Sequence, residues 1–182
     1  MIQTLPRIDR SIVLVGLMGA GKSTVGRRLA RRLGLDFVDS DTEIETAAGY
    51  SIVEIFERFG EASFRDGERR VIARLVEGPP KVIATGGGAF IDPATRALIL
   101  DRCIVVWLDA EVDLLAERVS RRESRPLLKD KDPREVLARL AEARNPIYSE
   151  AHIHVRSEPT PHDRTVERIL EELARSDLGR RR

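Results

Sequence analysis

The sequence is poor in several features that mark specialised proteins. Its 182 residues include one cysteine, Cys103, so no disulfide can form within the chain. Aromatic residues make up 4% of the chain, too few for the stacking platforms that bind single-stranded nucleic acid. No apolar run approaches the length of a membrane span or a signal peptide. We therefore expect a cytoplasmic protein in which Cys103 fills the core of the fold.

The chain also lacks an excess of one charge. Lys and Arg number 31 and Asp and Glu number 30, a net charge of +1, which favours neither nucleic acid nor a membrane surface as partner. A length of 182 residues suits one domain with a sizeable core. We predict a single domain over 1–182, with an N-terminal arm at 1–10, a polar, proline-containing loop at about 120–132 and a basic tail at 175–182.

The segment 16–24, GLMGAGKST, has the pattern of a phosphate-binding loop. It follows an apolar run, 11–15, and precedes 25–33, in which leucines recur at helical spacing. Glycines between a strand and a helix let successive N–H groups face an anion, and the helix N-terminus adds its positive end. Lys22 can reach the outer phosphates and Ser23 can bind Mg²⁺. A glycine-rich turn that matches by chance is the alternative, but every fixed position is present in order.

Apolar runs alternate with amphipathic segments along the rest of the chain. The runs that predict strands are 11–15, 35–39, 81–85, 103–108 and 153–155. Segments that predict helices are 25–33, 42–48, 51–60, 61–77, 93–100, 111–122, 133–144 and 162–174. This alternation indicates an α/β protein with a parallel sheet and helices on both faces. Ligands of such sheets bind beyond the carboxyl ends of the strands.

Two aspartates follow the second predicted strand, 35–39, which is short enough to be buried. Asp39 and Asp41 stand two apart on what we predict is extended backbone, so both carboxylates point to one side. Beside a phosphate loop they would repel a nucleotide unless a cation lay between them, which suits Mg²⁺ near one and a substrate hydroxyl near the other. The alternative is that both aspartates are helix N-caps.

Other candidate site residues lie farther along the chain. Arg65 and Glu68 stand one helical turn apart. Glu68 could hold the Arg65 guanidinium in place for a carboxylate ligand, or the two could form an ordinary exposed ion pair. Three consecutive glycines stand at 86–88. Because they carry no side chains, a ligand can lie directly against the main chain there. Arginines at 118, 125 and 144 are candidates for anion binding or solvated surface residues.

His152 and His154 alternate on the last predicted strand. No third metal ligand accompanies them in the sequence, whereas a zinc site takes at least three protein ligands. We therefore interpret them as surface or strand-edge histidines.

These segments together resemble the shikimate kinase family. The resemblance runs from about Ile12 to Tyr148 and rests on a set of motifs in a fixed order. Beyond the phosphate loop, which many kinases share, the set comprises DSD at 39–41, GEASFR at 60–65 with Glu68, TGGG at 85–88, RPLL at 125–128 and RNPIY at 144–148.

The resemblance implies a P-loop, nucleoside-monophosphate-kinase-like three-layer sandwich. Its five-stranded parallel sheet has the order 2-3-1-4-5, with helices on both faces and a closing lid at about 120–132. The implied activity is ATP-dependent phosphorylation of the 3-hydroxyl of shikimate, a step toward chorismate and the aromatic amino acids, with ATP and Mg²⁺ as cofactors. We expect a monomer whose partner is this small molecule.

The resemblance also implies residue roles. The nucleotide site comprises Gly19, Ala20, Gly21, Lys22, Ser23, Thr24, Arg118 and Arg125. Ser23 binds Mg²⁺ and Asp39 does so through water. Lys22, Asp41 and Arg125 are the implied catalytic residues: Lys22 contacts the phosphates, and Arg125 descends from the lid onto the transferring phosphate. Arg118 lies against the adenine.

The implied acceptor site uses Asp41, Arg65, Glu68, Gly87, Gly88 and Arg144. Both arginines hold the shikimate carboxylate, Glu68 orients Arg65, and the glycines line the ring. Asp41 binds the substrate hydroxyls, and the sequence leaves open whether it takes a proton or only orients the hydroxyl.

One segment departs from the family pattern. After Tyr148 the family usually supplies a basic loop beside the adenine, and 156–161, RSEPTP, matches it poorly. We leave the residues on that side of the adenine unassigned.

Two other functions remain alternatives. One is a kinase for a gluconate-type sugar acid, which the phosphate loop alone does not exclude. The other is a nucleotide-dependent binding module without catalysis, which would be expected to lack Lys22, Asp41 or Arg125.

Overall fold

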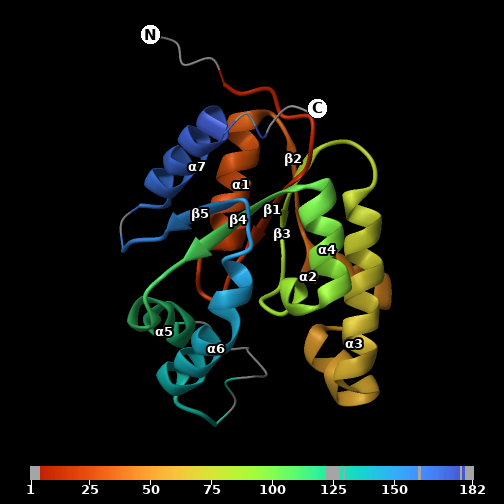
Figure 1. The fold of residues 1–182 in the computed structure, drawn as a ribbon. Coiled ribbons are helices and arrows are strands. Elements are labelled where there is room, and N and C mark those ends of the chain that lie inside the picture. Colours follow the sequence, from red (N-terminus) through yellow and green to blue (C-terminus); the bar gives the residue numbers. More distant parts are fainter. Residues whose placement is uncertain (1–4, 122–127, 129, 160, 177, 179–182) are drawn as a thin grey trace.

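The computed structural model describes residues 5–121, 128, 130–159, 161–176 and 178 (Figure 1). A five-stranded sheet forms its centre, with the strand order β2-β3-β1-β4-β5 and only parallel pairs, as the sequence predicted. The strands are β1 Ile12–Val15, β2 Asp36–Asp39, β3 Lys81–Ala84, β4 Ile104–Asp109 and β5 Ile153–Arg156. Because Val15 pairs with Trp107 and Asp39 with Ala84, the carboxyl ends of neighbouring strands meet at one edge.

Helices cover both faces of the sheet, which confirms the three-layer prediction. They are α1 Lys22–Leu33, α2 Ser40–Ala48, α3 Ile52–Val76, α4 Pro93–Arg102, α5 Val112–Ser120, α6 Pro133–Tyr148 and α7 His162–Ser176, with a 3₁₀ turn, η1, at Ala89–Ile91. Figure 1 shows α1 and α7 together on one side of the sheet and α3 and α4 together on the other. The same view shows α5, α6 and part of α3 extending past the carboxyl ends of the strands.

The core follows the apolar runs. All four residues of β1 are buried, as are the first five of β4, so both strands are covered on both faces. Cys103 is fully buried, and burial raises the pKa of its thiol to about 11, in agreement with its predicted role in the core. The prediction for β2 was wrong: Asp36 is exposed and the rest of the strand is only half-buried. The reason is that β2 is an edge strand with β3 as its one neighbour.

Two predicted features of α3 are present, and one helix boundary differs from the prediction. The predicted break at Gly60 is present: its φ of 82° and ψ of 171° interrupt α3. The predicted capping box is also present, because Ser51 and Glu54 bond each other's backbone N–H groups. By contrast, α6 runs past its predicted end at Arg144 to Tyr148. Pro146 lies in its last turn, where the missing N–H removes a single helical hydrogen bond.

No helix among the described residues is long and apolar enough to cross a membrane. Much of the predicted lid loop, together with 1–4 of the arm and most of the tail, lies outside the described residues.

Candidate active site

The loop between β1 and α1 has the backbone of an anion-binding turn. Gly16, Gly19 and Gly21 have φ values of 144°, 83° and 92°, in the left-handed region that favours glycine. A Cβ on Gly16 would stand 2.6 Å from the carbonyl oxygen of Leu108, so the loop runs directly against the end of β4. Lys22 begins α1 and donates its Nζ to the Gly16 carbonyl at 2.8 Å. The ammonium group and the N-terminus of α1 therefore lie at the same loop, where an anion is stabilised.

Ser23 and Asp39 form the predicted metal-side pair. The Ser23 hydroxyl donates to Asp39 Oδ2 at 2.6 Å, while Asp39 Oδ1 accepts from the backbone N–H of Asp41 at 3.0 Å. Asp39 is thus the N-cap of α2, which confirms that interpretation, and its hydrogen bond to Ser23 also places its carboxylate beside the phosphate loop.

The donor set at this point fits Mg²⁺. Among the residues that the structure describes, no group of three or more His, Cys, Asp or Glu side chains is placed to hold a metal ion. Mg²⁺ needs no such group, because it keeps several waters and binds through one or two protein oxygens together with substrate phosphates. The hydroxyl of Ser23 and the carboxylate of Asp39 meet that requirement.

Asp41 corrects a prediction about its backbone. It lies in the first turn of α2 rather than on extended chain, and it is not an N-cap, because Asp39 begins the helix two residues earlier than predicted. Its carboxylate still faces the glycine segment: Asp41 Oδ1 is 2.8 Å from the position of a Cβ on Gly86. Asp41 therefore lies between the metal-side pair and the glycines.

Arg65 and Glu68 form an interior pair, not an exposed one. Arg65 Nη1 donates to Glu68 Oε1 at 2.8 Å, and the Glu68 side chain is 2% exposed against 25% for Arg65. Burial raises the pKa of Glu68, and the Arg65 charge opposes that change. Glu68 Oε2 is buried without a hydrogen-bond partner in the described part of the chain. A buried oxygen of this kind is an acceptor for a ligand hydroxyl or a bound water.

The glycine segment 86–88 is the point where the predicted acceptor residues meet. A Cβ on Gly88 would stand 2.5 Å from Arg65 Nη1, and one on Gly87 would stand 3.3 Å from Arg144 Nη1. Two guanidinium groups from α3 and α6 thus converge on main chain that carries no side chains. Such a pair suits a planar carboxylate.

Tyr148 is a residue of this region that the sequence analysis named in a motif but gave no role. Its side chain is fully buried at the end of α6, and its hydroxyl donates to the carbonyl oxygen of Gly87. A signal for it existed in the sequence, because Tyr148 stands one helical turn after Arg144.

Arg118 and His162 border the phosphate loop from the other side. Arg118 donates to the Gly19 carbonyl at 3.1 Å, to Ser157 Oγ at 3.3 Å and to the Glu158 carbonyl at 3.2 Å. Burial lowers the pKa of Arg118. His162 begins α7, and its Cε1 is 3.1 Å from the position of a Cβ on Gly21. The segment that departs from the family pattern is therefore linked to the loop through Arg118, and His162, directly after that segment, lies beside the loop. Arg125 lies outside the described residues.

The alternating histidines hold no metal site in the described part of the chain. His152 Nδ1 accepts from the backbone N–H of Val105 at 2.9 Å, and the ring of His154 stacks on Trp107 with centroids 4.2 Å apart. Both histidines are exposed and lie at the edge strand β5 or directly before it, which agrees with their interpretation as surface or strand-edge residues.

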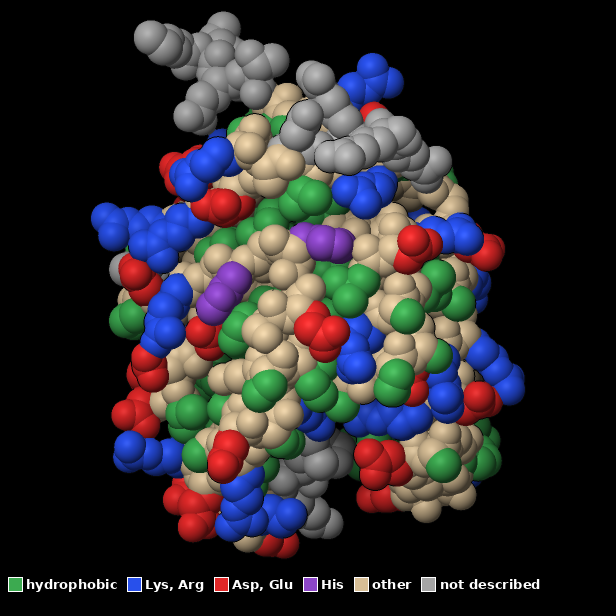
Figure 2. All heavy atoms as spheres, in the orientation of Figure 1, with side chains coloured by type: hydrophobic (Ala, Val, Ile, Leu, Met, Phe, Trp, Pro, Cys, Tyr) green, Lys and Arg blue, Asp and Glu red, His purple; other side chains and the backbone are tan. Residues whose placement is uncertain are grey.

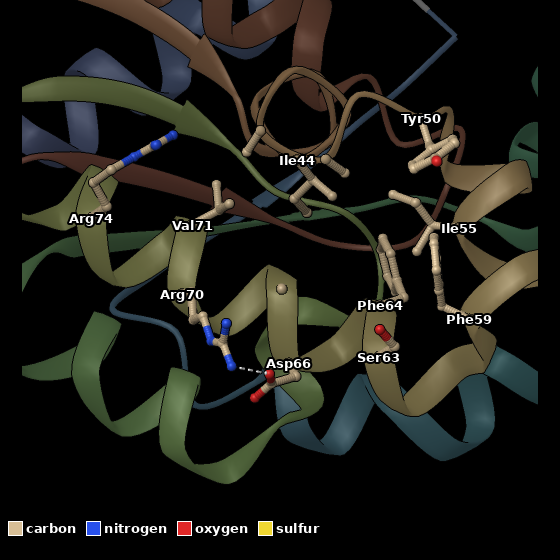
Figure 3. Close-up of a pocket in the computed structure, with 13 residues that line it drawn as sticks. Ile44, Tyr50, Ile55, Phe59, Ser63, Phe64, Asp66, Arg70, Val71 and Arg74 are labelled. Carbon is tan, nitrogen blue, oxygen red and sulfur yellow. Dashed lines mark hydrogen bonds and ion pairs between the residues drawn. The ribbon is translucent and has the colours of Figure 1, made fainter.

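A hollow of about 530 Å³ lies between α2 and α3, away from this cleft (Figure 3). Its walls include Ile44, Tyr50, Phe59, Arg70 and Arg74, and none of the predicted site residues lines it.

Comparison with known proteins gives the family. The shikimate kinase family model matches residues 18–174. A shikimate kinase from Paramagnetospirillum magneticum is 62% identical over 167 residues, which cover 92% of this chain and 86% of that protein. Another from Caulobacter vibrioides is 61% identical over 168 residues, 92% of this chain and 84% of that protein.

Among solved structures, a shikimate kinase from Acinetobacter baumannii in complex with shikimate superimposes with a TM-score of 0.89. It is 40% identical, and the match covers 93% of this chain and 95% of that one. The chain therefore belongs to the shikimate kinase family.

Proposed function

We propose that the cleft at the carboxyl ends of the strands transfers the γ-phosphoryl group of ATP to the 3-hydroxyl of shikimate, giving shikimate 3-phosphate and ADP, on the way to chorismate and the aromatic amino acids. One observation carries the assignment of the site: Asp41, Arg65 and Arg144 converge on the side-chain-free segment 86–88. A small acid with hydroxyl groups needs this combination, because two cations hold its carboxylate while a carboxylate meets its hydroxyl.

The nucleotide side is formed by 19–24 with Arg118. Backbone N–H groups of the loop and the Lys22 ammonium would hold the phosphates, and Ser23 and Asp39 would hold Mg²⁺, Asp39 through water. When bound, Mg²⁺ would supply positive charge to the phosphates. Arg118 lies against the adenine, a role supported by its hydrogen bond to Gly19 at the loop itself.

The acceptor side positions the substrate before any bond changes. Arg65 and Arg144 bind the carboxylate, and Glu68 holds the Arg65 guanidinium in place through their 2.8 Å hydrogen bond. Gly87 and Gly88 let the ring lie against the main chain. Phosphoryl transfer depends mostly on such positioning and on charge stabilisation, because its transition state is loose.

Asp41 and Arg125 act on the reacting groups. Asp41 orients the 3-hydroxyl toward the γ-phosphorus and accepts its proton, which leaves late in a loose transition state. Arg125 places its charge on the phosphoryl group as it moves between the two oxygens. The oxygen of the acceptor gains the phosphoryl group, and ADP leaves.

We propose further that the protein works as a cytoplasmic monomer without nucleic-acid or membrane partners. The near balance of charges supports this, and Figure 2 shows basic and acidic side chains interspersed over the described residues of the face drawn. Light scattering coupled to gel filtration at working concentration tests the monomer, for which a mass near 20.4 kDa is expected.

The reaction is tested by ADP release from Mg-ATP with the purified protein. Shikimate, gluconate and a nucleoside monophosphate serve as acceptors in parallel. We expect release with shikimate alone. Release with gluconate instead would keep the phosphate site and overturn the acceptor roles, and binding of ATP without release under any condition would favour a non-catalytic module.

A further inference from the structure

Tyr148 is placed where two parts of the acceptor site meet. Its ring is fully buried and packs against Phe90 of η1, with centroids 6.3 Å apart, and against Trp107 of β4, with centroids 6.0 Å apart. Because η1 begins directly after the glycine segment, the ring joins the end of α6 both to this turn and to the sheet. The position of its hydroxyl is therefore fixed by packing on several elements.

The hydroxyl lies beside two groups of the acceptor site. It donates to the carbonyl oxygen of Gly87, and the Arg144 guanidinium, one helical turn earlier on α6, lies close enough to counter the effect of burial on the pKa of the phenol. Burial raises the pKa of Tyr148 to about 12, with Arg144 and Arg65 opposing that change. The phenol is thus protonated at neutral pH, so it donates its single proton to the Gly87 carbonyl and keeps its oxygen as an acceptor that can face Arg144.

A buried tyrosine commonly bonds a backbone carbonyl without any part in function. The arrangement here goes further, because Arg144 Nη1 lies 3.3 Å from the position of a Cβ on the same Gly87. The phenol and the Arg144 guanidinium therefore both lie against Gly87, the main chain that lines the proposed substrate. Loss of the hydroxyl would free the guanidinium and this main chain to move relative to each other.

We propose that Tyr148 is a positioning residue of the acceptor site, whose hydroxyl fixes the Gly87 carbonyl and the Arg144 guanidinium relative to each other and so sets the affinity for the shikimate carboxylate. This inference rests on the proposed function. The contacts of Tyr148 among the described residues are with Gly87, Phe90 and Trp107, so we expect its effect to fall on acceptor binding and not on the chemical step.

Tyr148→Phe removes the hydroxyl and keeps the ring. We expect the KM for shikimate to rise about tenfold, with kcat and the KM for ATP within about twofold of the wild type. The matched control is Tyr50→Phe, the same change in the other tyrosine of the chain, whose ring packs on Phe59 beside the hollow. Tyr50→Phe is expected to leave all three constants unchanged.

A second acceptor separates positioning from general damage. With an analogue whose carboxylate is replaced by a hydroxymethyl group, the penalty of Tyr148→Phe is expected to fall below about twofold, because Arg144 no longer has an anion to hold. An unchanged KM for shikimate, or equal rises in the KM values for shikimate and ATP, would overturn the role. Wild-type protein that releases no ADP with shikimate would instead overturn the proposed function itself.

Nuclear magnetic resonance keeps the inference testable if the variant does not fold. Tyrosine labelled with ¹³C at the ζ carbon gives two signals, one for each tyrosine, and Tyr50→Phe assigns the remaining one to Tyr148. Saturating shikimate is expected to shift the Tyr148 signal, and ADP alone is not. A Tyr148 signal that does not respond to saturating shikimate would contradict the proposal.

Discussion

The guanidinium of Arg65 occupies the space that a side chain on Gly88 would fill. A Cβ on Gly88 would stand 2.5 Å from both Nη1 and Nη2 of Arg65. The φ of Gly88 is −94°, which any residue adopts, so glycine is required here for space and not for its backbone freedom. Arg65 and the glycine segment are therefore fitted to each other.

Gly88→Ala should displace Arg65 from the acceptor site. We expect the KM for shikimate to rise about tenfold or more while the KM for ATP changes little, because the methyl group pushes the guanidinium away from its ligand. Steady-state kinetics with each substrate varied in turn measures the KM for shikimate and the KM for ATP separately.

Gly67→Ala is the matched control for that variant. A Cβ on Gly67 meets nothing within 4 Å, and the residue lies in α3, where alanine is the better helix former by roughly 0.5–1 kcal/mol. The control should unfold at a slightly higher temperature with unchanged kinetics. Equal kinetics for Gly67→Ala and Gly88→Ala would argue against the fit between Gly88 and Arg65.

Asp39→Asn should separate the two roles of Asp39. Asparagine is as good an N-cap as aspartate, so α2 and the fold should be kept. The Mg²⁺ concentration for half-maximal activity should rise about tenfold, because an amide beside Ser23 lacks the charge that holds the metal's water. Titration of activity with Mg²⁺ at fixed ATP measures this.

Asp92→Asn is the control for the metal-side variant. Asp92 caps α4 by accepting from the backbone N–H of Thr95 at 2.9 Å, and its ion-pair partner is Arg69 of α3. The Mg²⁺ concentration for half-maximal activity of Asp92→Asn should equal that of the wild type. If Asp39→Asn also left the requirement unchanged, Asp39 would be only a cap.

The buried Glu68 should give the free energy of unfolding a characteristic pH dependence. Burial raises its pKa above the usual 4.5, so between the two values the folded state binds more protons than the unfolded state. The Glu68 contribution to stability therefore increases as the pH falls through the raised pKa toward 4.5.

Chemical denaturation of the wild type and Glu68→Gln from about pH 8 downward tests that sign. The free energy of unfolding of the wild type relative to the variant should rise as the pH falls. A relative decline over the same range would mean that the pairing with Arg65 outweighs burial.

Arg125→Ala should lower kcat by roughly 10²-fold or more, as loss of a charge-stabilising arginine does in phosphoryl transfer. The melting temperature should be unchanged. Arg121→Ala is the control, because Arg121 is an exposed residue whose partner, Glu117, lies one turn away on α5. Unchanged turnover of Arg125→Ala would remove Arg125 from the site.

The strands and the phosphate loop were predictable because they depend on local patterns, whereas the strand order came from the resemblance to the family. Buried parallel strands such as β4 appear as continuous apolar runs, and the loop needs its residues at fixed spacing. The convergence of 39–41 and 86–88 followed from the rule that parallel strands share a carboxyl edge.

What could not be predicted depends on tertiary contacts. The burial of Glu68 comes from the packing of α3 against the glycine segment, and helical spacing alone fits an exposed pair equally well. Asp41 proved to be helical because Asp39 caps α2 earlier than the pattern indicated. Tyr148 gained its role only when α6 continued through Pro146 and placed its hydroxyl on Gly87.

Calorimetry on Arg65→Ala tests the acceptor site most directly, with Arg70→Ala as its control. Arg70 is on the same helix and pairs with Asp66 at 2.6 Å, but its side chain is 80% exposed. We expect Arg65→Ala to weaken shikimate binding by roughly 30-fold or more while ATP binding is kept, because a hydrogen-bonded charge at the ligand is lost. Arg70→Ala should bind both ligands as the wild type does. Equal losses of shikimate and ATP binding in Arg65→Ala, or intact shikimate binding, would contradict the assignment of Arg65 to the shikimate carboxylate.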